Sequence, residues 1–376
     1  MIDQPRERAL ARVDLGAVER NCATLRSLLA PSTALCAVVK ADGYGHGDVW
    51  CANAALAGGA SWLAVATADE AAELRRHGIA ARILVMGALT REEAKIAIEA
   101  AADLVAWRER SVRGLAALAR SCGLPSRVHV KLDTGMGRLG TKDTREARTV
   151  AEVVVAEQGL ELAGLMTHFA TADELGDDYF SEQASAFSAF AEELRRSYPN
   201  AIVHAANSAA TYRDRATHFD LVRCGIAIYG LDPLQQDPLA HGLEPALSLH
   251  SYVADVKRFE RGQSAGYGRR WSAEQPTWVA TLPIGYGDGW RRGLANNGEV
   301  LVRGRRYPII GMVSMDNITV DLGPVTDVEA GDGAVLIGEQ GEERILCEEV
   351  AERLATINYE VTCGLTARVR RSYARR

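Results

Sequence analysis

Residues 34–47, ALCAVVKADGYGHG, place one lysine between an apolar run and a glycine-rich segment. A short continuous apolar run bounded by turn residues is typical of a buried β-strand. Lys40 would stand at the end of that strand, where partial loss of water disfavours its charged form. A neutral amine is a nucleophile that can form a Schiff base with an aldehyde. The glycines that follow let the backbone approach a bulky anion such as a phosphate.

Two interpretations of this segment follow. In the first, Lys40 is the covalent anchor of pyridoxal phosphate, and Tyr44 lies in the same loop. In the second, Lys40 is a solvated residue at a strand end and the glycines form a tight turn. The segment by itself leaves both open, so the surrounding chain has to distinguish them.

Apolar runs and helical patterns alternate from residue 34 to residue 224. The predicted strands are 34–39, 63–66, 82–86, 103–106, 128–132, 162–166, 202–205 and 220–223. The predicted helices are 48–57, 68–77, 91–101, 109–121, 145–158, 179–198 and 208–213. This alternation implies parallel strands. Eight such units predict an α/β fold of the (β/α)8 TIM-barrel type, with an open doubly wound sheet as the alternative.

The sequence pattern changes after residue 229, where glycine and proline residues indicate a linker. Strand-like runs without intervening helices follow at 247–256, 277–282, 300–302, 309–313, 318–322 and 334–338. We also expect a helix at 347–354, a last strand at 360–369, and a solvated arginine-rich tail. The predicted domains are a barrel at 1–240 and a mostly β C-terminal domain at 241–376. A strand at about 9–15 is a candidate to join the second domain.

Composition excludes several classes of protein. The chain has 376 residues, 47% of them hydrophobic, and a formal net charge of −6. Nucleic-acid binding requires a basic face, so we expect no nucleic-acid partner. The seven cysteines are odd in number and widely spaced, which predicts neither a disulfide framework nor a metal site. No secretory signal or membrane-length apolar run is visible, so a cytoplasmic protein without membrane contact is expected.

Polar side chains recur where the predicted barrel strands end, which is where barrels place functional groups. These strand-end residues are Lys40, Tyr44, Lys131, Arg138, His168, Asn207, Ser208, Arg223, Gly225 and Ile226. Ser208 is predicted to open a helix as an N-cap, and helix N-termini bind anions. Any one of these residues alone would be unremarkable. Five polar strand ends together favour an active site.

One competing motif lies in the same region. Residues 135–140, GMGRLG, match the dinucleotide-binding pattern between a strand and a helix. Four predicted strands precede it, however, whereas a dinucleotide-binding unit usually comes first in its domain. No Gly-x-Ser-x-Gly nucleophile motif occurs. In the second domain, Tyr267, Tyr286 and Tyr359 lie in glycine-rich or turn-like segments, and each alone could be a simple turn residue.

Taken together, these segments resemble the alanine racemases, pyridoxal phosphate enzymes with a barrel and a β domain. The resemblance extends over nearly the whole chain. Its markers are residues 37–47, 131–140, 167–170, 206–209, 223–230, 266–268, 282–289, 311–316 and 358–363. Two positions depart from the family pattern: Ser314 stands where cysteine is frequent, and Gly287 where alanine is frequent. Neither position carries the chemistry.

The resemblance implies a role for each of the following residues. Lys40 would hold the cofactor as an aldimine and act as one base, and Tyr267 would be the second base. The phosphate would be held by Tyr44, Ser208, Gly225, Ile226 and Tyr359, and Asn207 would also belong to the cofactor-binding residues. Arg223 would bind the pyridine nitrogen with His204 behind it, and His168 would flank the ring. Arg138 and Met315 would bind the substrate carboxylate, Lys131 would be a candidate for carbamylation, and Tyr286 would narrow the entrance.

The same resemblance implies the biological setting. The expected reaction is the interconversion of L-alanine and D-alanine, which supplies D-alanine for peptidoglycan. The expected assembly is a head-to-tail homodimer with shared active sites, in which Tyr267, Tyr286 and Met315 face the partner's barrel. A barrel-type decarboxylase, a broader amino-acid racemase and a non-catalytic pyridoxal phosphate binder remain the alternatives. The binder would need neither the β domain nor Tyr267.

Overall fold

A computed structural model describes residues 7–376 of the chain. These residues form two compact units, one made of residues 18–228 and the other of residues 7–17 and 229–376. Within the described residues, no helix is both long enough and apolar enough to span a membrane. The same residues contain no cluster of three histidine, cysteine or acidic side chains that could hold a metal ion.

The unit of residues 18–228 contains an eight-stranded parallel sheet in the order β8-β7-β6-β5-β4-β3-β2-β9. Its strands are β2 (Ala34–Val38), β3 (Trp62–Val65), β4 (Arg82–Val85), β5 (Asp103–Ala106), β6 (Ser126–Lys131), β7 (Leu160–Met166), β8 (Ile202–His204) and β9 (Leu221–Cys224). Backbone hydrogen bonds from Asp220 N to Val203 O (3.0 Å) and from Arg223 N to Ala206 O (2.9 Å) join the β8 and β9 segments. The sheet is therefore nearly closed, and the predicted barrel is confirmed.

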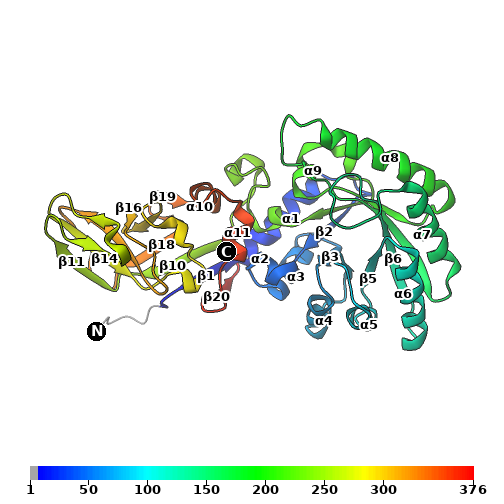
Figure 1. Ribbon diagram of the computed structural model, residues 1–376, viewed down its shortest axis with the longest axis horizontal. Helices are drawn as coiled ribbons and strands as arrows, with labels where there is room; N and C mark the ends of the chain where they lie inside the picture. Colours follow the sequence, from blue (N-terminus) through cyan, green and yellow to red (C-terminus); the bar gives the residue numbers. More distant parts are fainter. Residues whose placement is uncertain (1–6) are drawn as a thin grey trace. The chain divides into compact units, whose positions relative to one another are not determined.

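Helices surround this sheet (Figure 1). They are α1 (Leu15–Ser27), α3 (Asp48–Ala57), α4 (Ala68–Arg76), α5 (Arg91–Glu99), α6 (Glu109–Cys122), α7 (Thr144–Ala156), α8 (Tyr179–Ser197) and α9 (Ser208–Arg213). Local sequence explains where several begin: Thr67 with Glu70 and Thr90 with Glu93 form capping boxes at α4 and α5. In α4, α5, α6 and α7 the buried residues recur at helical spacing, as the 3.6-residue periodicity predicts.

The other unit is built around an antiparallel sheet. Its strands are β1 (Leu10–Asp14), β10 (Leu247–Tyr252), β11 (Asp255–Phe259), β12 (Ser264–Ala265), β13 (Trp271–Ser272), β14 (Thr277–Leu282), β15 (Glu299–Val302), β16 (Arg305–Ile310), β17 (Ile318–Gly323), β18 (Gly333–Gln340), β19 (Glu343–Ile345) and β20 (Arg370–Ala374). Two helices, α10 (Cys347–Arg353) and α11 (Asn358–Cys363), accompany them. The prediction of a mostly β C-terminal domain is confirmed.

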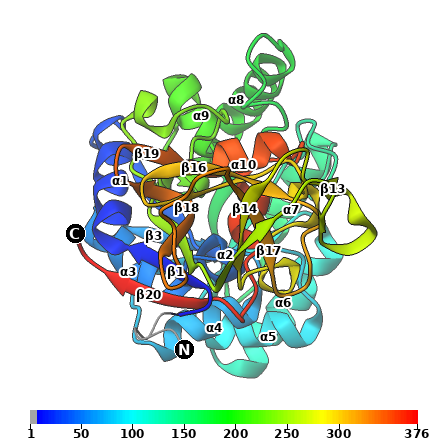
Figure 2. The same cartoon turned by 90° about the vertical axis from the view of Figure 1, so that its left-hand side faces the viewer.

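Three predictions for this unit were wrong. The expected strand 247–256 is two strands, because β10 pairs with β1 and β18 whereas β11 pairs with β14. The expected strand 360–369 begins instead within α11. The arginine-rich end is not a solvated tail, since β20 pairs in parallel with β1 (Figure 2). The arginine-rich end is ordered by its backbone pairing with β1. Arg371 Nη1 also donates hydrogen bonds to the carbonyls of Thr366 (2.6 Å) and Val369 (2.7 Å).

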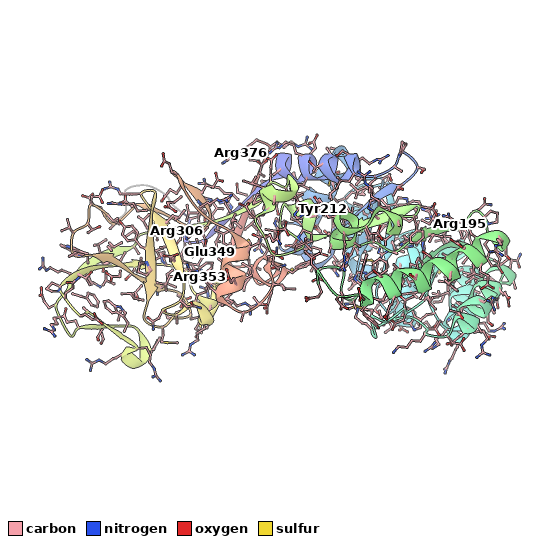
Figure 3. All side chains as sticks on the ribbon, turned by 90° about the horizontal axis from the view of Figure 1, so that it is seen from above. Arg195, Tyr212, Arg306, Glu349, Arg353 and Arg376 are labelled. Atoms are coloured by element: carbon pink, nitrogen blue, oxygen red, sulfur yellow. The ribbon has the colours of Figure 1, made fainter. Side chains whose placement is uncertain are left out.

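A network of ion pairs ties α10 to the antiparallel sheet. Arg306 on β16 binds Glu299 (3.1 Å) and Glu349 (2.8 Å), and Arg353 binds Glu299 (2.6 Å). Figure 3 shows Arg306, Glu349 and Arg353 close together in this unit. Because several half-buried charges share partners, the network contributes more than isolated surface pairs would.

Candidate active site

Lys40 follows β2 and begins the short turn α2 (Lys40–Tyr44), which is left-handed. Ala41, Asp42 and Tyr44 have φ values of 53°, 53° and 54°, and Gly43 between them has 59°. For residues other than glycine, this conformation costs roughly 1–2 kcal/mol each. Hydrogen bonds offset the cost, from Ala41 N to Glu70 Oε1 (2.6 Å) and from Gly43 N to Val39 O (3.0 Å). The conformation of the backbone beside Lys40 is therefore strained but firmly held.

Tyr44 lies beside Gly225 because glycine leaves room for it. Tyr44 is 7% exposed, and a Cβ atom at Gly225 would lie 2.3 Å from its hydroxyl oxygen. Ser208 Oγ accepts hydrogen bonds from the backbone N–H of Gly225 (3.0 Å) and of Ala227 (3.4 Å). A phenol, a hydroxyl and backbone N–H groups thus meet where β2, β8 and β9 end, with buried Ile226 next in the chain. Such a group of donors is suited to a phosphate.

The structure corrects one detail of this group of residues. Asn207, not Ser208, is the N-cap of α9, because its side chain accepts a hydrogen bond from Ala210 N at 2.9 Å. Ser208 is the first residue of the helix, and its hydroxyl turns toward the loop after β9 instead. Both residues remain part of the predicted anion-binding end.

Arg223 is the central cation of the barrel interior, with 2% of its surface exposed. Its Nη2 group donates to the carbonyls of Thr167 (2.8 Å) and Ala205 (2.9 Å) and lies 3.2 Å from His168 Nδ1. Its Nη1 group lies 2.9 Å from His204 Nδ1. Burial lowers the pKa of Arg223 to about 10, so it is still a cation at neutral pH.

The Nε–H group of Arg223 has no hydrogen-bond partner among the described residues, although it is buried. An unpaired buried donor on a charged side chain is costly. The four acceptors around the two Nη groups fix the plane of the guanidinium, and therefore the direction of this unpaired N–H. It is a donor for which residues 7–376 supply no acceptor.

Lys131, at the end of β6, is 5% exposed. Burial, followed by the nearby cations Arg223 and Arg138, lowers its pKa to about 8. The pKa of His168 is lowered well below its usual value, first by burial and then by Arg223 and Lys131. His168 is therefore neutral at pH 7, whereas Lys131 carries an unusually large fraction of neutral amine.

Arg138 is exposed on the loop between β6 and α7. This loop contains the glycine pattern 135–140, and it folds back on Asp133, whose carboxylate accepts hydrogen bonds from Gly135 N (3.0 Å) and Gly137 N (2.9 Å). The glycines therefore close a turn on a carboxylate of the chain. A dinucleotide-binding loop would instead direct these N–H groups at a pyrophosphate.

The remaining predicted residues lie in the antiparallel unit. Tyr267, Tyr286 and Met315 are 75%, 42% and 51% exposed. Backbone hydrogen bonds from Tyr286 N to Ser314 O (3.0 Å) and from Gly287 N to Met315 O (2.9 Å) hold two of their loops together. Tyr267 lines a shallow cavity of about 320 Å³ with Met312, Ser314 and Asn317, among others.

Buried polar residues anchor these loops. Asp288 is fully buried and accepts hydrogen bonds from Arg8 Nη1 (2.9 Å) and Gly285 N (3.0 Å), which fixes the turn that carries Tyr286. Tyr359 is half-buried on α11, next to fully buried Asn358. Asn358 Nδ2 donates to Asp232 O and to Glu348 Oε1, both at 2.8 Å.

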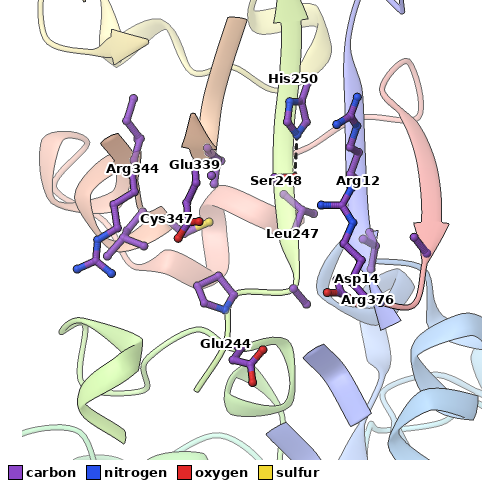
Figure 4. Close-up of a pocket in the computed structure, with 18 of the residues that line it drawn as sticks. Arg12, Asp14, Glu244, Leu247, Ser248, His250, Glu339, Arg344, Cys347 and Arg376 are labelled. Atoms are coloured by element: carbon purple, nitrogen blue, oxygen red, sulfur yellow. Dashed lines mark hydrogen bonds between the residues drawn. The ribbon is translucent and has the colours of Figure 1, made fainter. Parts of the chain in front are cut away.

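A larger cavity of about 510 Å³ in the same unit is lined by Arg12, His250 and Arg344, among others (Figure 4). Several of its polar groups already have partners: Ser248 Oγ lies 2.8 Å from His250 Nε2, and Arg344 pairs with Asp237 outside the lining. We assign no ligand to it.

Sequence reasoning missed two buried polar residues of the barrel, Asp103 and His129. His129 lies 2.9 Å from His204, and Asp103 lies 3.1 Å from His129. The available signal was an aspartate at the start of the otherwise apolar strand 103–106 and a histidine between two valines at 128–130. Without the pairing of the strands, nothing in the sequence connects these residues to Arg223.

Comparison with known proteins gives a consistent result over the whole chain. Residues 13–233 match the model of the alanine racemase N-terminal domain, and residues 246–373 match that of the C-terminal domain. An alanine racemase of Geobacillus stearothermophilus is 44% identical over 368 residues, covering 97% of this chain and 93% of the relative. Alanine racemase 1 of Bacillus subtilis is 42% identical, covering 96% and 92%.

Solved structures agree with this assignment. The alanine racemase of a D-cycloserine-producing Streptomyces lavendulae superposes with a TM-score of 0.92 and 38% identity, covering 99% of this chain and 98% of that one. An alanine racemase of Bacillus anthracis with bound L-Ala-P gives a TM-score of 0.90 at 38% identity, covering 99% and 96%. The chain belongs to the alanine racemase family, a family of pyridoxal phosphate-dependent racemases.

Proposed function

We propose that this protein interconverts L-alanine and D-alanine with pyridoxal phosphate, and that Lys40 is the residue that holds the cofactor. The observation that carries this proposal is the arrangement at the barrel strand ends. Lys40 follows β2, the unpaired Nε–H of Arg223 lies at β9, and Tyr44, Ser208 and Gly225 converge nearby. The family assignment supports the same reaction.

The residues present fit pyridoxal phosphate at both of its polar ends. The buried Nε–H of Arg223 would donate to the pyridine nitrogen. The group made of Tyr44, Ser208 and the backbone N–H groups of Gly225 and Ile226 would take the phosphate, and the Gly225 N–H would exchange its present acceptor, Ser208 Oγ, for a phosphate oxygen. Asn207 and Tyr359 would contribute to cofactor binding, as the resemblance to the family implies. His168 would lie against the ring. When bound, pyridoxal phosphate supplies an electron sink for negative charge at the substrate Cα atom.

Two residues would move the proton. Lys40 Nζ would take or return the Cα proton on one face of the substrate, and Tyr267 Oη would act on the other. One base cannot easily serve both faces of a fixed planar species, so a second base is required. Arg138 and the backbone N–H of Met315 would bind the substrate carboxylate, since a guanidinium is a planar bidentate partner for such a group. Tyr286 would restrict the entrance to small side chains.

Lys131 would support Arg138 after carbamylation. Only a neutral amine adds to carbon dioxide, and the lowered pKa of Lys131 makes that form abundant near pH 8. The product is an anion, which would pair with Arg138 and reverse the repulsion that Lys131 otherwise exerts on it.

The exposure of Tyr267, Tyr286 and Met315 supports a head-to-tail homodimer in which they contribute to the partner's site. The protein would then act on a small-molecule amino acid in the cytoplasm and supply D-alanine for peptidoglycan. A broader amino-acid racemase is the second candidate, because the size of the substrate pocket in such a dimer decides between alanine and serine.

The test is incubation of the purified protein and pyridoxal phosphate with L-alanine, L-serine or D-alanine, followed by circular dichroism of the amino acid. We expect the signal of either alanine enantiomer to decay to zero, with serine slower. Lys40→Ala should be inactive, and Lys95→Ala, an exposed lysine on α5, is the matched control. An unchanged signal, or decay of the signal with release of carbon dioxide and formation of achiral ethylamine, would contradict the proposal.

A further inference from the structure

Four buried side chains form a continuous hydrogen-bonded chain across the barrel interior. Arg223 Nη1 lies 2.9 Å from His204 Nδ1, and His204 Nε2 lies 2.9 Å from His129 Nδ1. His129 Nε2 lies 3.1 Å from Asp103 Oδ2. None of the four is more than 2% exposed. This series of hydrogen bonds connects Arg223 on β9 to Asp103, the first residue of β5, through His204 on β8 and His129 on β6.

The observed orientation of the Arg223 guanidinium is compatible with only one order of protons along these hydrogen bonds. A guanidinium can only donate, so His204 Nδ1 must accept and its proton must be on Nε2. His129 Nδ1 must then accept from His204, which leaves the proton of His129 on Nε2, facing Asp103. Burial lowers the pKa of both histidines, so both are neutral and each carries one proton.

Asp103 lies at the end of this series of hydrogen bonds and is ionised. Although burial alone would raise its pKa, hydrogen bonds from His129 and Arg127 lower it below the usual value. Arg127 Nε lies 2.6 Å from Asp103 Oδ1, and Arg82 forms a second ion pair. Because a carboxylate only accepts, Asp103 and Arg223 impose the same proton order from opposite ends.

The backbone makes room for the two imidazoles. Strand β7 lies between β6 and β8, and a register shift beside His129 pairs that residue with Gly164. A Cβ atom at Gly164 would lie 2.3 Å from His129 Nδ1, which is the atom that accepts from His204. A side chain at this strand position would thus collide with the His129 imidazole and also with the carbonyl oxygen of Ile202, at 2.8 Å.

We propose that Asp103 is a positioning residue for Arg223, acting through His129 and His204 to fix the direction in which the guanidinium donates. Without the carboxylate, His129 can place its proton on Nδ1. His204 would then have to reverse as well and would present Nδ1–H to Arg223 Nη1, donor against donor. The guanidinium would turn, and its Nε–H would lose its direction. The identity of the acceptor for this Nε–H rests on the proposed function. The order of the protons on His129 and His204 does not.

The first experiment is ¹⁵N NMR of the histidine side chains in the protein freed of cofactor, from pH 5 to pH 9. We expect His129 and His204 to be neutral with the proton on Nε2 throughout this range, and Asp103→Asn and Gly164→Ala to move protons to Nδ1. A wild-type His129 or His204 that is cationic, or that carries its proton on Nδ1, overturns the proposal. Since no cofactor or substrate is present, this result is independent of whether the protein racemises alanine.

The second experiment measures kcat and KM for alanine and the pH dependence of the absorption of bound pyridoxal phosphate. Asp103→Asn should lower kcat about 10- to 100-fold, by analogy with the loss of outer hydrogen-bond partners of metal ligands, with KM little changed and the absorption titration shifted. Glu157→Gln is the matched control, because Glu157 also binds two arginines but no histidine. An Asp103→Asn protein that matches the control in kcat and in absorption overturns the proposal.

Discussion

Gly225 is the position where a single methyl group should most selectively damage cofactor binding. A Cβ atom there would lie 2.3 Å from the Tyr44 hydroxyl oxygen and 2.8 Å from Cζ. Both distances are shorter than van der Waals contact. Gly225 does not have a positive φ, so alanine introduces no backbone strain at that residue. Gly225→Ala should therefore act by displacing the phenol of Tyr44.

The magnitude follows from the interaction lost. A hydrogen bond to a charged group contributes about 1.5–3 kcal/mol, and about 1.4 kcal/mol corresponds to a tenfold change in affinity. Loss of the Tyr44 hydroxyl from a bound phosphate should weaken binding of pyridoxal phosphate about 10- to 100-fold. Pyridoxal, which has no phosphate, should bind wild type and variant almost equally.

The assay is titration of the cofactor-free protein with each compound, followed by absorption. Tyr44→Phe should give a similar loss, and the double variant should lose little more than either single variant, because both remove the same hydroxyl. Equal losses for pyridoxal and pyridoxal phosphate, or additive losses in the double variant, would refute the assignment of this group to the phosphate.

Three further variants test other parts of the account. Lys131→Met in cofactor-free protein and CO₂-free buffer should be more stable than wild type by up to about 3 kcal/mol at pH 7. The pKa of Lys131 is lowered from 10.5 to about 8, so the wild-type protein gains stability as the pH rises between these two values. Denaturation at several pH values should therefore show the stability difference between Lys131→Met and wild type vanish near pH 10.5. Gly114→Ala should stabilise the protein by about 0.5–1 kcal/mol in urea denaturation, since no atom of the described residues outside the helix lies within 4 Å of the new Cβ atom on α6; destabilisation would contradict the helix. Gly287→Ala places a Cβ atom 2.3 Å from Arg368 Nη1, so it should cost up to about 1 kcal/mol in wild type. The cost should be smaller in an Arg368→Ala background, where only the contacts with Met315 O (3.0 Å) and Met315 Cγ (3.2 Å) remain.

Much of the barrel could be predicted because its strands are short apolar runs separated by clear helix signals. The strand ends that carry Lys40, Lys131, Ser208 and Arg223 followed directly from that pattern. The left-handed turn after Lys40 could not be predicted, since three of its residues adopt a conformation that their types disfavour. Hydrogen bonding to Glu70, which is distant in sequence, stabilises it.

The remaining failures share one physical cause. Strand β20 consists largely of polar residues, and only its parallel pairing with β1 makes it a strand. Asp103 and His129 have a role only because β5, β6 and β8 bring them into line with Arg223. In each case the deciding interaction connects segments far apart in the chain, where local patterns carry no information.

The measurement that tests the central claim most directly is exchange of the alanine Cα hydrogen with deuterated water, started separately from each enantiomer. If Lys40 and Tyr267 serve opposite faces, Tyr267→Phe should slow exchange from one enantiomer about 100-fold or more, the size of a lost general base, and affect the other far less. Equal slowing from L-alanine and D-alanine would contradict the two-base account.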